Sequence, residues 1–183
     1  DFIEVKGNNF RNDNYSLSFW VCPLKNPSDK QYHYAISIGG PGGDQSVDIS
    51  NDAFNTIGWT FGTYLINSTP LTTSCAVSIL PELNKWQHIV AVRSNQTIKL
   101  YIDGKLVCES STKGLLPNYG VNTVLTIGRR AQGGQFLAAK IDEIAIYNRA
   151  LSDIEVKALY NQFPCDNLPT IRLDNLPALV CVN

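Results

Sequence analysis

The chain has 183 residues, of which 44% are hydrophobic and 17% charged, and its 15 basic and 16 acidic residues leave a net charge of −1. This length suits one sizeable β-sandwich core and is short for two domains. The balanced charge argues against a nucleic-acid partner, and no apolar run approaches the roughly 18 residues that predict a transmembrane segment.

The first half of the chain predicts short strands separated by polar loops. Residues 15–22 alternate apolar or aromatic side chains with serines, which is the period of a half-buried strand, and Pro23 ends the run. The glycine-rich run at 39–43 is expected to lie outside any regular strand. Further strands are expected at 33–38, 46–50, 57–66 and 74–80.

A meander beginning at Trp86 is the clearest pattern in the second half. Its strand-length runs are separated by Ser94-Asn95-Gln96 and by Asp103-Gly104. Asp-Gly between alternating runs predicts a hairpin, because a type I′ turn needs positive φ at both central residues. The expected strands are 86–93, 97–102 and 105–109, followed by 124–129 and 138–147.

One helix is expected near 151–161. Ser152 and Glu155 have the spacing of a capping box, and apolar residues follow at helical intervals. Many strands with one short helix predict an all-β antiparallel sandwich. Beyond Pro164 the sequence repeats Asp-Asn-Leu-Pro, so we expect a sandwich domain at 1–162 and a separate tail at 163–183.

The five cysteines favour disulfides over a zinc site, because they show no C-x-x-C spacing and both histidines stand alone. Cys165 and Cys181 flank the repeat and are expected to close a loop of about 16 residues in the tail. Cys22 and Cys75 are the expected second pair. This pairing leaves Cys108 free or joined to another chain.

Other features favour a secreted protein. The chain contains no methionine and starts at Asp1, which indicates a processed chain or an excised domain. Sequons at Asn14, Asn67 and Asn95 would accept glycans in a eukaryotic secretory pathway, although such triplets also arise by chance.

Several short motifs follow one another in a fixed order. They include Phe19-Trp20-Val21, Trp86 to Val92, Leu100 to Gly104, and a run from Lys140 to Glu155 that combines a strand, a turn and a capped helix. Over residues 2–162 this combination resembles the laminin-G-like, concanavalin A-like domains, whose wider relatives include pentraxins and many lectins. The resemblance implies a jelly-roll β-sandwich with one short C-terminal helix, but one fold hosts many functions.

The resemblance also implies a structural calcium site at Asp142. Related jelly rolls often place an acid there, completed by backbone carbonyls of an N-terminal loop, here residues 7–14 with Asp13. The alternative is an exposed Asp142 whose carboxylate is hydrogen-bonded to a turn. A pentraxin-type pair of calcium ions is not expected, because Arg129 and Arg130 stand where acids and amides would be needed.

Polar and aromatic residues of the predicted loops have sugar-binding chemistry, since carboxylates and amides bind hydroxyls and an aromatic ring packs on the apolar face of a sugar. Two arginines suit the carboxylates or sulfates of acidic glycans, with solvated surface arginines as the alternative. Trp20 and Trp86 are expected in the core. The candidate ligand residues are Asp44, Asn51, Asp52, Trp59, Tyr64, Arg129, Arg130 and Gln135.

The sequence favours binding over catalysis, because it contains no E-x-D-x-x-E run, G-x-S-x-G elbow, H-E-x-x-H motif or phosphate loop. We therefore expect a secreted, lectin-like domain that recognises extracellular or cell-surface glycans. The alternative is a structural or adhesive module that binds extracellular proteins or its own copies. The odd cysteine would then serve a homo-oligomer or a disulfide-linked partner.

Overall fold

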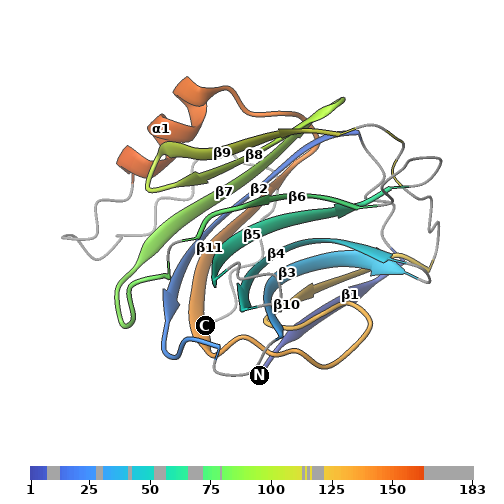
Figure 1. Ribbon diagram of the computed structural model, residues 1–183, viewed down its shortest axis with the longest axis vertical. Coiled ribbons are helices and arrows are strands. Elements are labelled where there is room, and N and C mark those ends of the chain that lie inside the picture. Colours follow the sequence, from blue (N-terminus) through green and yellow to red (C-terminus); the bar gives the residue numbers. More distant parts are fainter. Residues whose placement is uncertain are drawn as a thin grey trace.

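The computed structural model describes residues 1–7, 13–27, 31–40, 43–51, 57–65, 72–78, 80–112, 114, 116 and 122–162. Figure 1 shows their arrangement as two layers of strands with a helix at one corner. The strands are β1 (Ile3–Lys6), β2 (Asn14–Pro23), β3 (Tyr32–Gly40), β4 (Gly43–Asn51), β5 (Ile57–Tyr64), β6 (Thr72–Ala76), β7 (Gln87–Ser94), β8 (Thr97–Ile102), β9 (Lys105–Ser111), β10 (Val124–Ile127) and β11 (Ala139–Tyr147), and the helix is α1 (Asp153–Gln162).

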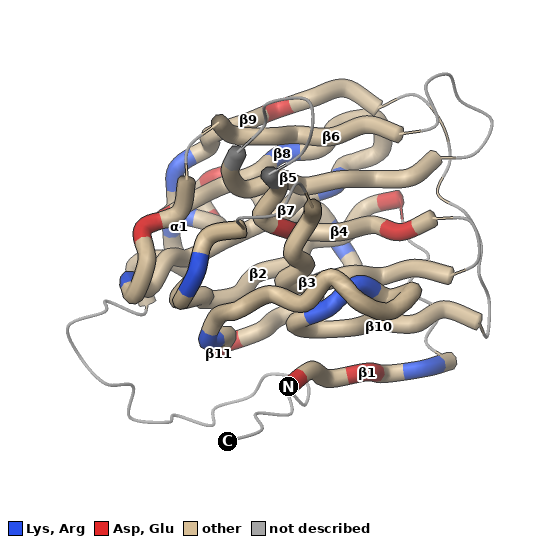
Figure 2. The backbone as a smooth tube through the Cα atoms, turned by 60° about the horizontal axis from the view of Figure 1, so that its bottom comes forward, with Lys and Arg blue, Asp and Glu red and all other residues tan. Residues whose placement is uncertain are grey.

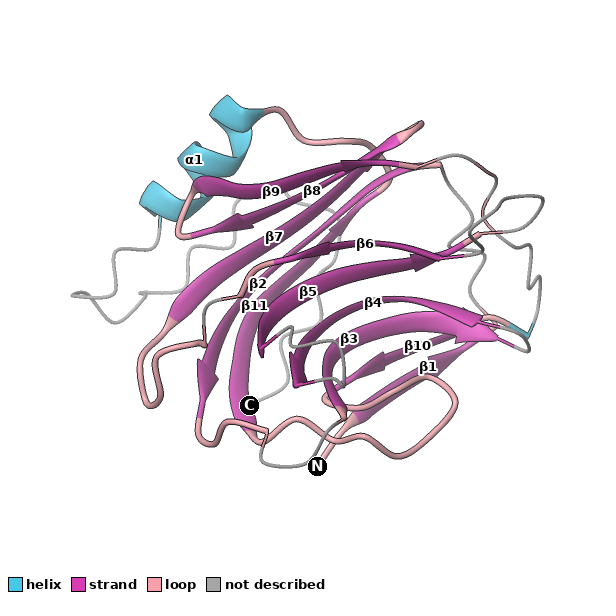
Figure 3. Ribbon diagram, in the orientation of Figure 1, coloured by secondary structure: helices cyan, strands magenta, loops and turns pink. Residues whose placement is uncertain are grey.

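The strands form two antiparallel sheets. Sheet A has the order β1-β10-β3-β4-β5-β6, and sheet B has the order β11-β2-β7-β8-β9. In Figure 3 the helix lies beside sheet B, where its Val156 packs against Val90, Val92 and Tyr101. The predicted all-β antiparallel jelly-roll sandwich with one short C-terminal helix is confirmed.

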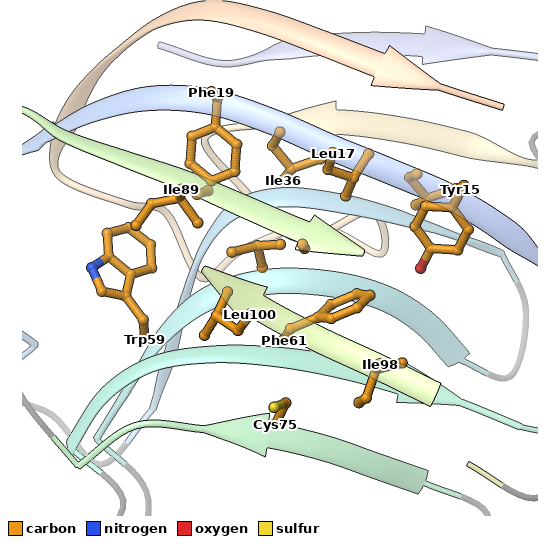
Figure 4. Close-up of a cluster of buried hydrophobic side chains, with 14 of the residues drawn as sticks. Tyr15, Leu17, Phe19, Ile36, Trp59, Phe61, Cys75, Ile89, Ile98 and Leu100 are labelled. Carbon is orange, nitrogen blue, oxygen red and sulfur yellow. The ribbon is translucent and has the colours of Figure 1, made fainter. Parts of the chain in front are cut away.

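The core lies between the two sheets and is built from alternate residues of their strands. Phe19 and Ile89 from sheet B meet Trp59 and Phe61 from sheet A, all with no exposed surface (Figure 4). Burying side chains of this size stabilises the fold by about 1.5–3 kcal/mol each. Figure 2 shows that the charged residues are spread along strands of both sheets and do not gather on one of them.

One local prediction, the Asp103-Gly104 turn, is confirmed, and another, for the glycine run, is wrong in part. Asp103 and Gly104 have φ values of 51° and 71°, as the type I′ turn between β8 and β9 requires. Three glycines of the run expected outside strands do lie in strands: β3 extends through Gly39 and Gly40, and Gly40 pairs with Gly43 at the start of β4, while residues 41–42 lie outside the described residues. Glycine is needed there for space, because a Cβ on Gly39 would lie 2.8 Å from the Gly43 carbonyl oxygen.

The predicted cysteine pairing is also wrong. Cys75 of β6 is bonded to Cys108 of β9, with 5.7 Å between their Cα atoms, whereas Cys22 is a buried free thiol. The reason is topological. β6 and β9 are edge strands of the two sheets on the same side of the sandwich, while β2 lies inside sheet B. Cys165 and Cys181 lie outside the described residues, so their pairing and the tail boundary stay predictions.

The capping box at the start of α1 is confirmed, with the helix beginning at Asp153. The Glu155 backbone N–H donates to Ser152 Oγ at 3.3 Å, and the Ser152 N–H donates to the Glu155 carboxylate at 2.8 Å. Two hydrogen bonds from Arg149 also reach that carboxylate. The Arg149 guanidinium and the Ser152 backbone N–H together lower the pKa of Glu155 to about 2.

Replacing Ser152 with alanine should destabilise the protein by about 1 kcal/mol, because the first turn of α1 loses its cap. Urea denaturation followed by tryptophan fluorescence measures this change. Ser152→Thr, which keeps the hydroxyl, is the control and should unfold near the wild-type midpoint. A wild-type midpoint for Ser152→Ala would contradict a stabilising role for the cap.

Candidate ligand-binding groove on sheet A

A groove of about 510 Å³ lies on the outer face of sheet A, over β3 to β6. It follows from the two-residue period of β4. Gln45, Val47 and Ile49 are buried toward sheet B, so the residues between them point outward. The outward-facing residues of β4 that line the groove are Asp44, Ser46, Asp48 and Ser50.

Three tyrosines supply aromatic surface to the groove. Tyr32 and Tyr34 come from β3, with 6.3 Å between their ring centroids, and Tyr64 comes from β5 across the groove. Tyr34 is only 6% exposed. Its burial, and then the charges of Asp48 and Asp44, raise the pKa of the Tyr34 phenol, so this residue stays a neutral hydrogen-bonding group.

Hydroxyl groups hold the two carboxylates of the groove in place. Ser46 Oγ donates to Asp48 Oδ2 at 3.0 Å, and Ser37 Oγ donates to Asp44 Oδ2 at 2.9 Å. Asp48 is 2% exposed, so its charge lies at the floor of the groove. These contacts fix the acceptors before any ligand arrives, which lowers the entropy cost of binding.

A loop after β10 closes one end of the groove. Arg130 donates from Nε to Asp44 Oδ2 at 3.2 Å and from Nη2 to Asp44 Oδ1 at 3.5 Å, and its guanidinium lies 5.7 Å from the Tyr34 ring centroid. Gln132 Nε2 donates to the Gly40 carbonyl at 3.1 Å. Burial opposes the charge of Arg130, but the hydrogen bond and the charge of Asp44 outweigh it, and the pKa of Arg130 is raised.

Comparison with known families agrees with this architecture. A family profile described as "Concanavalin A-like lectin/glucanases superfamily" matches residues 1–157. The chain belongs to this superfamily. The concanavalin A-like domain is also 25% identical over 154 residues to the adhesion G-protein coupled receptor V1 of Danio rerio. That match covers 81% of this chain and 2% of the receptor, so the domain spans only a small part of its relative.

Solved structures show the same fold. Domain 4 of AbnA, a GH43 extracellular arabinanase from Geobacillus stearothermophilus solved in complex with arabinotriose, is 20% identical with a TM-score of 0.62, covering 82% of this chain and 68% of that one. A SAP-like pentraxin from Limulus polyphemus is 14% identical with a TM-score of 0.63, covering 87% and 75%. Within the described residues, no helix is long and apolar enough to cross a membrane.

The groove brings together some of the ligand residues predicted from the sequence. Asp44, Tyr64 and Arg130 line it, and Gln135 accepts a hydrogen bond from Arg130 at 3.4 Å. Asn51 is the last residue of β4, and Asp52 lies outside the described residues.

The prediction for Trp59 is wrong. Its side chain is fully buried in the core (Figure 4). Its Nε1 donates to Gln87 Oε1 at 3.3 Å. Because neighbouring residues of a strand face opposite sides, it is Thr60 that reaches the groove. Tyr34 and Asp48 were missed, although the alternation of polar and apolar residues along 44–50 was the signal that could have revealed the outer face of β4.

Arg129 does not serve the groove. Its guanidinium is bonded to the Glu4 carboxylate and lies 4.0 Å from the centroid of the Phe2 ring. The side chain is therefore neither part of a pair with Arg130 nor a solvated surface arginine, because it fastens β1 to the end of β10.

The two acids of the predicted calcium site, Asp142 and Asp13, do not come together, and residues 8–12 of its expected carbonyl loop lie outside the described residues. Asp142 is exposed, and its Oδ1 accepts the Glu143 N–H at 2.9 Å, which is the alternative considered from the sequence. Asp142 pairs with Trp20, six positions along β2 from Asn14 and hence about 20 Å away. Asp13 instead lies 3.8 Å from the buried Arg93 guanidinium. No group of three or more His, Cys, Asp or Glu side chains gathers within the described part of the chain.

Two of the three sequon asparagines lie side by side. Asn14 Nδ2 donates to Asn95 Oδ1 at 3.2 Å, and the Asn95 backbone N–H donates to Asn14 Oδ1 at 3.0 Å. Both hydrogen bonds are exposed, and Asn67 lies outside the described residues. Glycosylation of the three sites stays a prediction.

Proposed function

We propose that this domain binds carbohydrate in the groove of sheet A. The observation that carries the proposal is the combination of tyrosine rings with two positioned carboxylates in one groove. The half-buried Tyr32 and Tyr64 offer apolar faces for a sugar ring, and Asp44 and Asp48 accept hydrogen bonds from sugar hydroxyls. The AbnA domain of the same fold, solved with arabinotriose, supports a sugar as the ligand class.

The spacing of the carboxylates favours binding over hydrolysis. Asp44 and Asp48 are four residues apart on one strand, so their Cα atoms are separated by about 13 Å. Glycosidases place their two carboxylates about 5–9.5 Å apart on either side of the scissile bond. The two aspartates of the groove are therefore better suited to hold separate hydroxyls of an oligosaccharide than to act on one bond.

An extracellular location is part of the proposal. The Cys75–Cys108 bridge joins the two sheets, and such disulfides persist in oxidising compartments and are rare in the cytosol. The similarity to an adhesion receptor supports the same location. The glycans that the domain meets would then be those of cell surfaces or the extracellular matrix.

The proposal is tested by binding of the purified chain to a broad glycan array, followed by Asp48→Asn on any hit. Asp48→Asn keeps the shape of the side chain but removes its charge. Hydrogen bonds to charged groups contribute about 1.5–3 kcal/mol, so the affinity should fall about 10- to 100-fold. Asp142→Asn removes the same charge from the exposed surface of β11 and should bind as the wild type does. Glycan binding in this groove would be contradicted if the chain bound no glycan on the array, or if Asp48→Asn bound with wild-type affinity.

A second function is favoured by the surface around β1. Phe2, Ile3 and Val5 are 47%, 43% and 39% exposed, and the neighbouring Phe136 is 52% exposed. β1 is an edge strand of sheet A, and an apolar edge strand is a template for pairing with another chain. An adhesive module that binds protein or its own copies would use this surface. That function would be favoured if the chain bound no glycan on the array and self-associated with increasing concentration in analytical sedimentation.

A further inference from the structure

We infer that the groove selects neutral glycans over acidic ones, and that Asp44 sets this preference by engaging Arg130. The inference rests on the proposed function, because it names the class of ligand that the same groove takes. It also reverses the expectation from the sequence, in which Arg129 and Arg130 were candidates for binding carboxylates or sulfates.

The groove carries a net negative charge. Among its described lining residues, the charged side chains are Asp44, Asp48 and Arg130. Two carboxylates and one guanidinium leave a net charge of −1 in a partly desolvated space, where charges are screened less than on the open surface. An acidic sugar in this groove therefore meets like charge, whereas a neutral sugar meets hydrogen-bond acceptors.

The Arg130 guanidinium is already engaged by a carboxylate of the protein. An arginine recognises a carboxylate or sulfate through two parallel N–H groups. In Arg130 the Nε and Nη2 groups already point at the two oxygens of Asp44, and Nη1 donates to Gln135. Asp44 thus fills the position that the anionic group of a ligand would take, and Ser37 holds Asp44 there.

The neighbouring cation, Arg129, cannot replace Arg130 in the groove. The guanidinium of Arg129 is bonded to Glu4 and covers the Phe2 ring, on the side of β1. Its side chain is 17% exposed, so it is not a free charge at the rim. Among the described residues that line the groove, Arg130 is the one basic side chain, and it is already paired.

The experiment compares matched pairs of glycans, each neutral oligosaccharide beside its sulfated or sialylated form, on the full chain. The wild type should bind the neutral member at least about tenfold more tightly. Asp44→Asn removes the charge opposite Arg130 and leaves one acceptor oxygen for its Nε and Nη2 groups, so it should lower this ratio about tenfold and lengthen retention on a heparin column. Asp142→Asn removes the same charge from β11 and should change neither quantity.

A second variant should change the ratio of neutral to acidic glycan affinity in the opposite direction. It tests the inference independently if Asp44→Asn folds poorly. Arg130→Gln removes the positive charge from the groove and should increase the discrimination against the acidic member. An unchanged ratio in both variants would overturn the role of the Asp44–Arg130 pair. Tighter binding of acidic members by the wild type would overturn the selectivity but leave glycan binding standing. Binding of neither member would overturn both proposals.

Discussion

Replacing Cys75 and Cys108 together with alanine should lower the free energy of unfolding by about 3–4 kcal/mol. The bridge spans a sequence separation of 33 residues, and in the chain-entropy model a loop of this length restricts the unfolded chain by about that amount. It also ties β6 to β9, so its loss releases the edge strands of both sheets at once. The measurement is urea denaturation, with the slope of the transition checked for two-state unfolding.

Reduction provides the internal control for this prediction. Dithiothreitol should destabilise the wild type and the Cys22→Ala variant by similar amounts, because Cys22 is a buried free thiol. The double alanine variant should not respond to the reductant through this bridge. The assignment would be contradicted if dithiothreitol left the stability of the wild type unchanged. A peptide map that joins Cys22 to Cys75 would contradict it too.

Lowering the pH from about 6.5 to about 4 should cost the protein about 3 kcal/mol through His88 alone. His88 is 2% exposed, and burial lowers its pKa from 6.5 to about 4. Between these two values the unfolded chain binds a proton that the folded chain does not, so stability falls as the pH falls. A shift of about 2.5 units corresponds to about 3 kcal/mol at 1.36 kcal/mol per unit. Below the folded-state pKa this contribution becomes constant.

The surroundings of His88 explain why its charged form is disfavoured. The ring packs against both Trp20 and Tyr160, at centroid distances of 5.1 Å and 6.1 Å, and its Nε2 is 2.9 Å from Ser18 Oγ. The Trp20 and Tyr160 rings are also in contact, with 5.8 Å between their centroids. A neutral imidazole suits this aromatic cluster between sheet B and α1, whereas an imidazolium ion would lose its hydration there.

Replacing the histidine itself assigns the pH dependence. His88→Gln should flatten the stability profile between pH 4 and 6.5. Stability is read from urea midpoints across that range. An NMR titration that placed the pKa of His88 near 6.5 would contradict the prediction.

Features fixed by neighbouring residues could be predicted from the sequence. The Asp103-Gly104 turn and the Ser152 cap each depend on residues a few positions apart, and both were found. Trp59 and Tyr34 show that a strand's buried face could not be predicted. A strand pattern gives alternation but does not say which face is covered when both faces carry aromatic residues. Strand β1 was missed because four residues are too few for a periodic pattern to stand out.

Contacts between distant residues could not be predicted. Cys75 meets Cys108 because β6 and β9 are edges of different sheets on the same side, a relation that appears only after the sheets are assembled. Arg130 meets Asp44 across 86 residues of sequence. Arg130 lines the groove, and its role as a ligand residue stays a prediction, but the sequence could not show that a carboxylate from another strand occupies its guanidinium.

The disulfide links the two sheets covalently along one edge of the sandwich only. The two sheets are fastened where β6 and β9 meet, whereas at the opposite margin β1 keeps more than a third of its Ile3 and Val5 side chains exposed. Partial opening of the sandwich should therefore begin at β1, because regions with few buried contacts open first in native proteins. The groove over β3 to β6 extends to the edge that the disulfide fixes, so it can stay formed while β1 at the opposite edge opens.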